Sequence, residues 1–173
     1  FNGLLNTQVS RTRLYLGKFF LLTFCMTACT FIATIILSLG MGTLMPDRGI
    51  DSLFVLAALL AVIGVLPILA IHLWISFLWG MGASIGLGMC GILMAALIGA
   101  TNLGGKAWMF VPWAWPVKMA MFPMIFTLSS TEMISKAAAQ FLIEISLSIF
   151  TLILFLAGGI LWFHKWEGRK YSE

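Results

Sequence analysis

Long uncharged stretches separated by short charged ones dominate the pattern along the chain. The 28 residues between Lys18 and Asp47 carry no charge, and neither do the 20 residues between Glu144 and Lys165. A helix of about 20 apolar residues crosses the roughly 30 Å of hydrocarbon in a bilayer. Each stretch therefore predicts one transmembrane helix.

A third uncharged stretch is too long for one crossing. It has 54 residues between Asp51 and Lys106, and a single helix of that length would measure about 81 Å. The stretch must therefore fold back on itself. We predict the turn at residues 79–82, because two glycines loosen the helix there and the tryptophans nearby suit a membrane interface.

The sequence accordingly predicts an all-α, polytopic membrane protein that forms a helical bundle. The four expected transmembrane helices cover residues 19–41, 53–74, 83–101 and 141–163. The first three fall within residues 19–105 and the last within residues 139–164. The composition agrees: 61% of residues are hydrophobic, 9% are charged and the mean hydropathy is +1.07, whereas a soluble domain carries about 25% charged residues.

Four crossings place both chain ends on one side of the membrane, and basic residues are more numerous there. The six basic residues near the chain ends are Arg11, Arg13, Lys18, Lys165, Arg169 and Lys170. The four on the opposite side are Arg48, Lys106, Lys118 and Lys136. Because basic residues concentrate on the cytoplasmic side, we expect residues 1–18 and the tail, residues 165–173, to be cytoplasmic. A net charge of +4 is too sparse for a nucleic-acid surface, so no nucleic acid is expected as a partner.

The sequence offers little catalytic chemistry. It has no GxxxxGK[ST] phosphate-binding loop, no HExxH and no CxxC, so it predicts neither ATP binding in the P-loop manner nor a metal centre of these kinds. Cys25, Cys29 and Cys90 lie in apolar stretches and are expected to be buried apolar residues. We expect no catalytic residue, no metal and no cofactor in this chain.

Residues 1–18 and 106–138 are not simple spans. The first segment is amphipathic, with Ser10 as an expected N-cap, and is either a juxtamembrane anchor or a docking surface for a cytoplasmic partner. In the second, three prolines within twelve residues exclude a straight helix, and Lys118 at bilayer depth would cost about 2.5–3.5 kcal/mol. We expect broken, short or re-entrant helices at the outer interface. The tryptophans there form either an aromatic belt or an outer gate that meets an amphipathic substrate, and they are Trp108, Trp113 and Trp115.

Small residues on helix faces predict packing. The threonines of the first span share one face and indicate either helix packing or a substrate-facing wall, and the glycines of the third span indicate close packing in a bundle or dimer. These residues are Thr23, Thr27, Thr30 and Thr34, and Gly82, Gly86 and Gly91.

Few ionisable residues fall within the expected spans. Glu144 lies about one turn inside the outer end of the last span, where we expect it to reach water; a mechanistic role is the alternative. His72 is expected to be a packed or interfacial residue, with a proton carrier as the alternative. Glu132 and Lys136 are predicted to form an i,i+4 ion pair.

Three stretches resemble segments of a known family. Residues 1–18, FNGLLNTQVSRTRLYLGK, resemble the cytoplasmic segment before the third span of type-2 ABC exporter permeases, where a stretch such as NLLSTPISRTKIYLGK leads into the helix. Residues 108–118 resemble the W-x-x-x-PWAWP stretch of the permeases that give lantibiotic producers self-immunity. Residues 72–77 are similar to a second marker of that family.

The resemblance implies a function and partners. Such permeases have six spans, so this chain would hold the last four and two would precede residue 1. The partners implied are a cytoplasmic ATP-binding subunit, which holds ATP and magnesium, and a second permease subunit or an identical copy. The exporter removes an amphipathic peptide, the lantibiotic, from the bacterial cytoplasmic membrane to the outside, and hydrolysis of ATP takes place in the separate subunit.

The resemblance also implies residue roles. The start of the chain transmits the ATPase motion, with Leu4, Leu5, Arg11 and Arg13 as the coupling residues. The broken outer segment acts near substrate release, with Trp108, Trp113, Trp115, Lys118 and Glu144 as substrate or gate residues. Two alternatives stay open: an ABC permease for a drug, a lipid-linked glycan or an ion, and an ATP-independent secondary carrier that uses Glu144 and His72.

Overall fold

The computed structural model describes residues 10–44, 51–101, 103, 105–128 and 130–165, and these residues form helices without any strand. Four helices are long and apolar enough to cross a membrane. They are α2 (Arg11–Leu44), α3 (Asp51–Trp79), α4 (Met81–Met94) with its π-helical continuation η1 (Ala95–Gly99), and α6 (Thr131–Lys165). Two shorter helices lie between them in the chain, the 3₁₀ helix η2 (Gly105–Phe110) and α5 (Ala114–Leu128). The prediction of an all-α membrane protein is confirmed.

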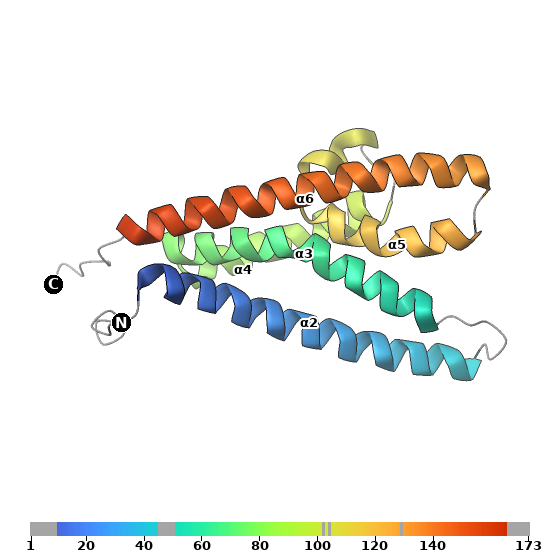
Figure 1. Cartoon of the computed structure of the whole chain (residues 1–173), viewed down its shortest axis with the longest axis horizontal. Coiled ribbons are helices and arrows are strands. Elements are labelled where there is room, and N and C mark those ends of the chain that lie inside the picture. The colour runs from blue at the N-terminus through green and yellow to red at the C-terminus, as the bar shows by residue number, and fades with distance from the viewer. Residues whose placement is uncertain (1–9, 45–50, 102, 104, 129, 166–173) are drawn as a thin grey trace.

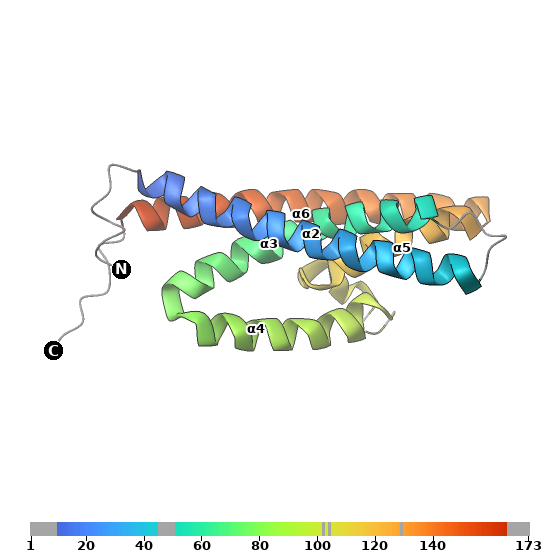
Figure 2. The same cartoon turned by 90° about the horizontal axis from the view of Figure 1, so that it is seen from below.

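The turn predicted at residues 79–82 is confirmed. α3 ends at Trp79 and α4 begins at Met81, and Gly80 between them has a φ of 90°. That left-handed conformation favours a residue without a Cβ atom. α3 and α4 therefore form a hairpin around Gly80 (Figure 2).

The helices run lengthwise along an elongated bundle (Figure 1). α2 begins and α6 ends at one end, which also holds the turn at Gly80 and which we call the terminal end. α2 ends and α3 begins at the opposite, distal end, where α5 also leads into α6. Figure 2 shows that α4 and η1 stop short of the distal end. The start of the first span and the end of the last thus share one side, as four crossings require.

α3 is the central helix of the bundle. It packs against α2, α4, α5 and α6. In the 18-residue stretch where α3 is most apolar, 33% is buried within the protein, whereas none of the most apolar 18-residue stretch of α2 is buried. Pro67 lies inside α3, where proline lacks the amide donor that the helix needs and bends it. Figure 2 shows the second half of α3 turning toward α4.

α5 pairs with only the first half of α3. Pro116 at its start lies so close to Gly64 that a Cβ atom on Gly64 would be 2.6 Å from the Pro116 Cα atom. Farther along, Pro123 shares a groove with Leu53 and Phe54. The segment predicted to be broken is indeed split into short helices, and α5 re-enters the bundle as far as the middle of α3.

The helices extend beyond the predicted spans. α6 begins at Thr131, ten residues before the expected start of the last span. The additional residues, TEMISKAAAQ, include good helix formers, and the predicted ion pair is confirmed, with Lys136 Nζ 2.7 Å from Glu132 Oε1. The hydropathy pattern locates the apolar part of a helix and does not mark where a polar extension begins.

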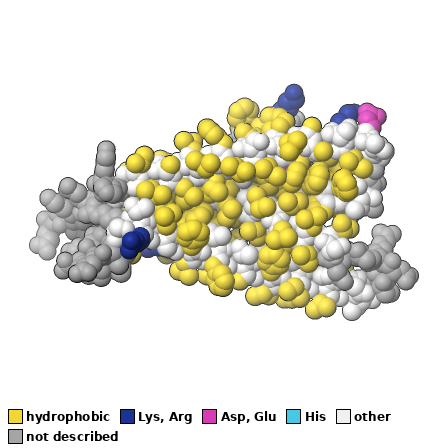
Figure 3. All heavy atoms as spheres, viewed as in Figure 1, with side chains coloured by type: hydrophobic (Ala, Val, Ile, Leu, Met, Phe, Trp, Pro, Cys, Tyr) yellow, Lys and Arg dark blue, Asp and Glu magenta, His cyan; other side chains and the backbone are white. Residues whose placement is uncertain are grey.

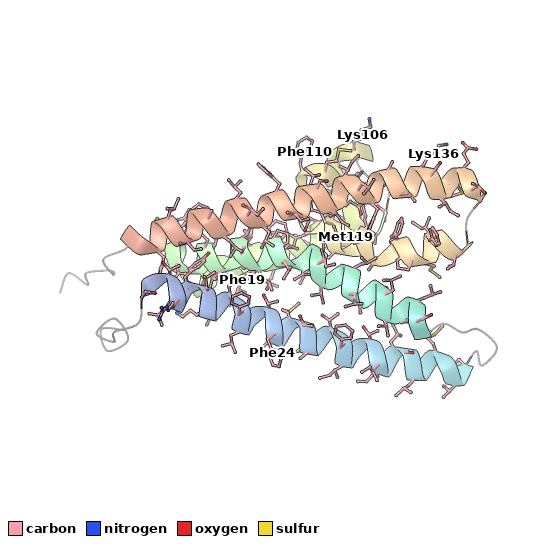
Figure 4. All side chains as sticks on the ribbon, in the orientation of Figure 1. Phe19, Phe24, Lys106, Phe110, Met119 and Lys136 are labelled. Carbon is pink, nitrogen blue, oxygen red and sulfur yellow. The ribbon has the colours of Figure 1, made fainter. Side chains whose placement is uncertain are left out.

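Apolar side chains cover most of the face shown in Figure 3, and the charged side chains lie toward its edges. Phe24, which is 72% exposed, points away from the bundle (Figure 4). The three cysteines, Cys25, Cys29 and Cys90, are exposed as well, so the prediction that they are buried is wrong. In a bilayer an apolar side chain is satisfied by lipid as well as by protein, so hydrophobicity alone does not place it inside the bundle.

The predicted packing faces have different surroundings. Thr23, Thr27 and Thr30 line a hollow of about 10 Å³ against α3, and the hydroxyls of Thr30 and Thr34 donate to carbonyls one turn earlier. Thr34 lines a separate hollow of about 370 Å³, so the choice between a packing face and a substrate-facing wall stays a prediction.

Among the three glycines, only Gly91 packs within the chain, where its missing side chain makes room for the Trp113 indole. Gly82 and Gly86 have no neighbour within 4 Å of the position that a Cβ atom would take. A contact of these two residues with another chain therefore stays a prediction.

Candidate functional site

Two buried polar side chains lie on α6, and a partly buried lysine lies on α5, which packs against α6. Glu144 and Ser148 on α6 are each 2% exposed and form the buried polar part of the described core. Lys118 on α5 lines one pocket together with Gln140, the residue one turn before Glu144 on α6. Ionisable residues within membrane spans are costly, and they commonly mark binding sites or transport paths. We therefore treat this cluster as the candidate functional site.

Glu144 is held by the residue one turn before it. Gln140 Nε2 donates a hydrogen bond of 2.8 Å to Glu144 Oε1, which the i,i+4 spacing on one helix permits. The expectation that Glu144 reaches water from a position near the end of the span is wrong in this structure. Because α6 starts at Thr131, Glu144 lies thirteen residues, or about 20 Å, along the helix.

Ser148 ties the cluster to the central helix. Its hydroxyl donates to the carbonyl of Ile63 on α3, at 3.4 Å. In a regular helix that carbonyl would accept the amide of the residue four positions later, but this residue is Pro67, which has no N–H. Ser148 thus partners an acceptor that the proline leaves open. The sequence analysis missed this contact, although the proline within a predicted span was the signal that a carbonyl would need a partner.

Lys118 faces one aromatic ring and lines a pocket. Its ammonium is 5.9 Å from the centroid of the Trp108 ring, a cation–π distance. With Gln140 it lines a pocket of about 250 Å³. Lys118 makes no ion pair within 4 Å with any described residue.

The tryptophans of this segment belong to the core. Trp108 is 7% exposed and Trp115 2%, and Trp115 Nε1 donates to the Trp108 carbonyl at 3.1 Å. They pack with Ala114 and Met119 in one buried cluster. Trp108 and Trp115 are therefore buried in this structure, whereas both expectations, the aromatic belt and the outer gate, placed them at the outer interface. Proline-rich, tryptophan-rich sequence indicated an interface, but the re-entry of α5 turns these rings inward.

Trp113 connects the same segment to the α3–α4 hairpin. Its ring meets the His72 ring edge-on, with 6.0 Å between centroids, and its indole fills the space left by Gly91. His72 Nδ1 lies 2.8 Å from Ser84 Oγ across the hairpin. This is the geometry of a packed histidine with a hydrogen-bond partner.

Ser84 lies within a motif that the sequence analysis overlooked. Residues 82–86 have the spacing G-x-S-x-G, which surrounds the nucleophilic serine in hydrolases when it occupies a strained turn between a strand and a helix. Ser84 instead follows a helix–helix turn, and its amide donates to the Gly80 carbonyl. The structural context that the motif requires is not present around Ser84, so we interpret the contact with His72 as part of the hairpin packing.

The residues expected to couple to an ATPase lie either at the terminal end of the bundle or outside the residues that the structure describes. Leu4 and Leu5 fall outside the described residues, as does the side chain of Arg11. Arg13 is exposed in the first turn of α2. The neighbouring Lys18 holds its ammonium 4.7 Å from the centroid of the Phe77 ring on α3.

No group of three or more His, Cys, Asp or Glu side chains within the described part of the chain could hold a metal ion. Comparisons of the chain with protein-family models, curated proteins and solved structures give no match. The functional argument therefore starts from the residues of this chain and from their geometry.

Proposed function

We propose that this chain is a permease subunit of an ATP-driven exporter that moves a lantibiotic, or a similar amphipathic peptide, out of the bacterial cytoplasmic membrane and thereby gives self-immunity. The observation that carries the proposal concerns the stretch with the sharpest resemblance, residues 108–116. This stretch joins η2 to α5, on which Lys118 lines a pocket together with Gln140 of α6. A re-entrant helix that carries a partly buried lysine, packed on a helix with a buried acid, is an expensive element in a membrane, which supports a role in transport.

The geometry supports a simple route for mechanical coupling. A partner ATPase would act at the terminal end, where Arg13 is exposed at the start of α2. α2 packs on α3, and α3 packs on α5, with Gly64 pressed against Pro116. A tilt of α2 and α3 would therefore shift α5 and the polar cluster at its far side. ATP and magnesium belong to the partner subunit in this proposal.

The surface leaves room for a second permease subunit or an identical copy. Only 6% of the most apolar 18-residue stretch of α4 and η1 is buried within the protein. The face of α4 at Gly82 and Gly86 has no neighbour within 4 Å of a Cβ position. Small residues on a transmembrane helix permit close approach by another helix.

One alternative has its own supporting observation. Glu144 is a buried acid with a lysine nearby, an arrangement that a proton-coupled secondary carrier also needs. Under this alternative the isolated chain would move its cargo without ATP, and Glu144→Gln would abolish the flux. A different cargo for an ABC permease, such as a drug, a lipid-linked glycan or an ion, is equally compatible with the fold.

Purification in mild detergent from cells that express the chain and its neighbouring genes tests the proposal. We expect an ATPase subunit with a Walker motif to be retained in stoichiometric amount. Arg13→Ala should weaken this retention, because it alters the exposed terminal end. Lys106→Ala, at an exposed position on η2 that points away from the bundle (Figure 4), is the matched control and should not. Proton-coupled flux by the chain without an ATPase would contradict the proposal.

A further inference from the structure

α2 is buried against the rest of the bundle mainly near its start. Among the side chains described on α2, only Tyr15 and Phe19 are buried, and the most apolar 18-residue stretch of the helix has no buried residue. Toward the distal end, a hollow of about 370 Å³ lies between α2 and Val55 on α3. The burial of α2 is therefore concentrated at the terminal end, where α2 also lies next to the end of α6 (Figure 1).

Tyr15 is the centre of an aromatic cluster that joins three helices. The centroid of its ring lies 6.0 Å from that of Phe77 on α3 and 5.9 Å from that of Phe163 on α6, and the latter two rings are 4.9 Å apart. Centroid distances of about 4.5–7 Å are those of attractive aromatic pairs. Because the Tyr15 side chain is 0% exposed, it fills a space that is closed on all sides.

The tip of the Tyr15 ring occupies a notch in α6 at Gly159. A Cβ atom on Gly159 would overlap the Tyr15 hydroxyl and lie 2.6 Å from the Tyr15 Cζ atom. The neighbouring Gly158 differs, because a Cβ atom there would only touch the Trp74 ring, at an ordinary contact distance of 3.7 Å. The fit of Tyr15 therefore depends on the missing side chain of Gly159.

The Tyr15 hydroxyl is buried and has no hydrogen-bond partner among the described residues. The Thr23 hydroxyl is in the same position, but a threonine can turn its hydroxyl to a carbonyl of its own helix, as Thr30 does. The ring of a tyrosine holds its hydroxyl away from the backbone of its own helix. A buried, unpaired hydroxyl is costly, and it regains hydrogen bonds when it reaches water. Packing therefore favours Tyr15 in the notch, whereas the hydroxyl favours its release.

We propose that Tyr15 is a releasable latch, which holds the start of α2 between α3 and α6 while its ring occupies the Gly159 notch and frees α2 when it leaves. Arg13 and Lys18, on either side of Tyr15, are exposed, and charged side chains of membrane helices lie close to water. A released hydroxyl therefore has water nearby, and a partner that acts on Arg13 acts two residues from the latch. That an ATPase is this partner rests on the proposed function, whereas the latch is a property of the chain itself.

The rate at which a buried cysteine reacts with a thiol reagent tests the proposal, because the reagent reaches the sulfur only while the surroundings are open. The three native cysteines are exposed and are replaced by Ala in the purified full chain. Ala70→Cys, at a 0% exposed position within the Tyr15 cluster, is the latch reporter. Ala114→Cys, at a 0% exposed position in the cluster that contains Trp115, is the core reporter and detects opening elsewhere.

The latch makes opposite predictions for two small substitutions. Tyr15→Phe should slow labelling of the latch reporter about fivefold, because the ring stays in place and the unpaired hydroxyl is removed. Gly159→Ala should accelerate labelling about fivefold or more, because the added methyl group excludes the ring from the notch. Gly158→Ala is the matched control and should change the rate less than about twofold. All three substitutions should leave the labelling of the core reporter unchanged.

Three results would overturn the proposal. Equal rates in Gly159→Ala and Gly158→Ala would show that Tyr15 does not occupy the notch. Labelling in Tyr15→Phe that is as fast as in the unmodified chain, or faster, would show that the hydroxyl does not favour release. Parallel changes in the latch reporter and the core reporter would show that Tyr15 only supports the fold as a whole. The measurement needs no ATPase, so a failure of the latch and a failure of the proposed transport function are separate results.

Discussion

Replacing Trp115 with Ala should lower the free energy of unfolding by about 3 kcal/mol, the low end of the range for tryptophan in a protein core. The low end applies because lipid is as apolar as the core, so the loss is mainly one of packing. Trp115 is 2% exposed and its indole N–H is bonded to the Trp108 carbonyl. Unfolding in mixed detergent micelles, followed by the loss of helical circular dichroism, measures the change.

Two control variants separate the loss of buried ring volume from the loss of the indole hydrogen bond as causes of the destabilisation. Trp79→Ala removes a tryptophan that is 68% exposed and should change the free energy of unfolding by less than about 0.5 kcal/mol. Trp115→Phe keeps much of the ring volume and loses the indole donor, so it should cost about 1 kcal/mol. Equal effects of Trp115→Ala and Trp79→Ala would show that Trp115 is not part of the core. If Trp115 instead contacted a substrate, its loss would reduce resistance while stability stayed unchanged.

Gly64→Ala should destabilise the protein by about 2 kcal/mol, within the range for overpacking. The added Cβ atom would lie 2.6 Å from the Cα atom and 2.8 Å from the nitrogen of Pro116. Backbone atoms cannot rotate away as a side chain can, and proline fixes its own φ angle. α5 would therefore have to move away from α3, which the same unfolding measurement detects.

Gly86→Ala is the matched control for this prediction. The substitution is chemically identical and also lies within a membrane-spanning helix, but nothing lies within 4 Å of the new atom. Alanine favours helix over glycine by about 1 kcal/mol, so Gly86→Ala should be neutral or slightly stabilising. A cost of Gly64→Ala no larger than that of Gly86→Ala would contradict the contact between α3 and α5. A cost in Gly86→Ala, measured in an assembled complex, would indicate that another chain packs on α4.

The helical architecture could be predicted because charge and hydropathy along the chain determine which segments cross a bilayer. Three uncharged stretches predicted four spans, because the longest must fold back near Gly80, and the prolines after residue 106 predicted the broken segment. The boundaries could not be predicted as well. Residues 131–140 are polar yet helical, and Glu144 is buried near the edge of the predicted span because α5 packs on this part of α6, with Phe122 stacked on Phe141.

Orientation toward protein or lipid was the main feature that the sequence left open. Cys25 and Trp115 are both apolar, but one faces outward and the other is buried, because both surroundings satisfy an apolar side chain. The contact of Ser148 with Ile63 joins residues 85 positions apart and depends on the packing of two helices. Within the candidate site, the pair Gln140–Glu144 follows from local spacing, whereas the approach of Lys118 requires the re-entry of α5.

Reconstitution in proteoliposomes tests the central claim most directly. The chain is inserted with its companion ATPase, a fluorescent lantibiotic is bound to the vesicle membrane, and the release of peptide on the side opposite the ATPase is followed after addition of ATP and magnesium. The account predicts release that requires ATP and stops when the Walker lysine of the companion is replaced. Release by the chain alone, driven by a proton gradient and independent of ATP, would contradict it.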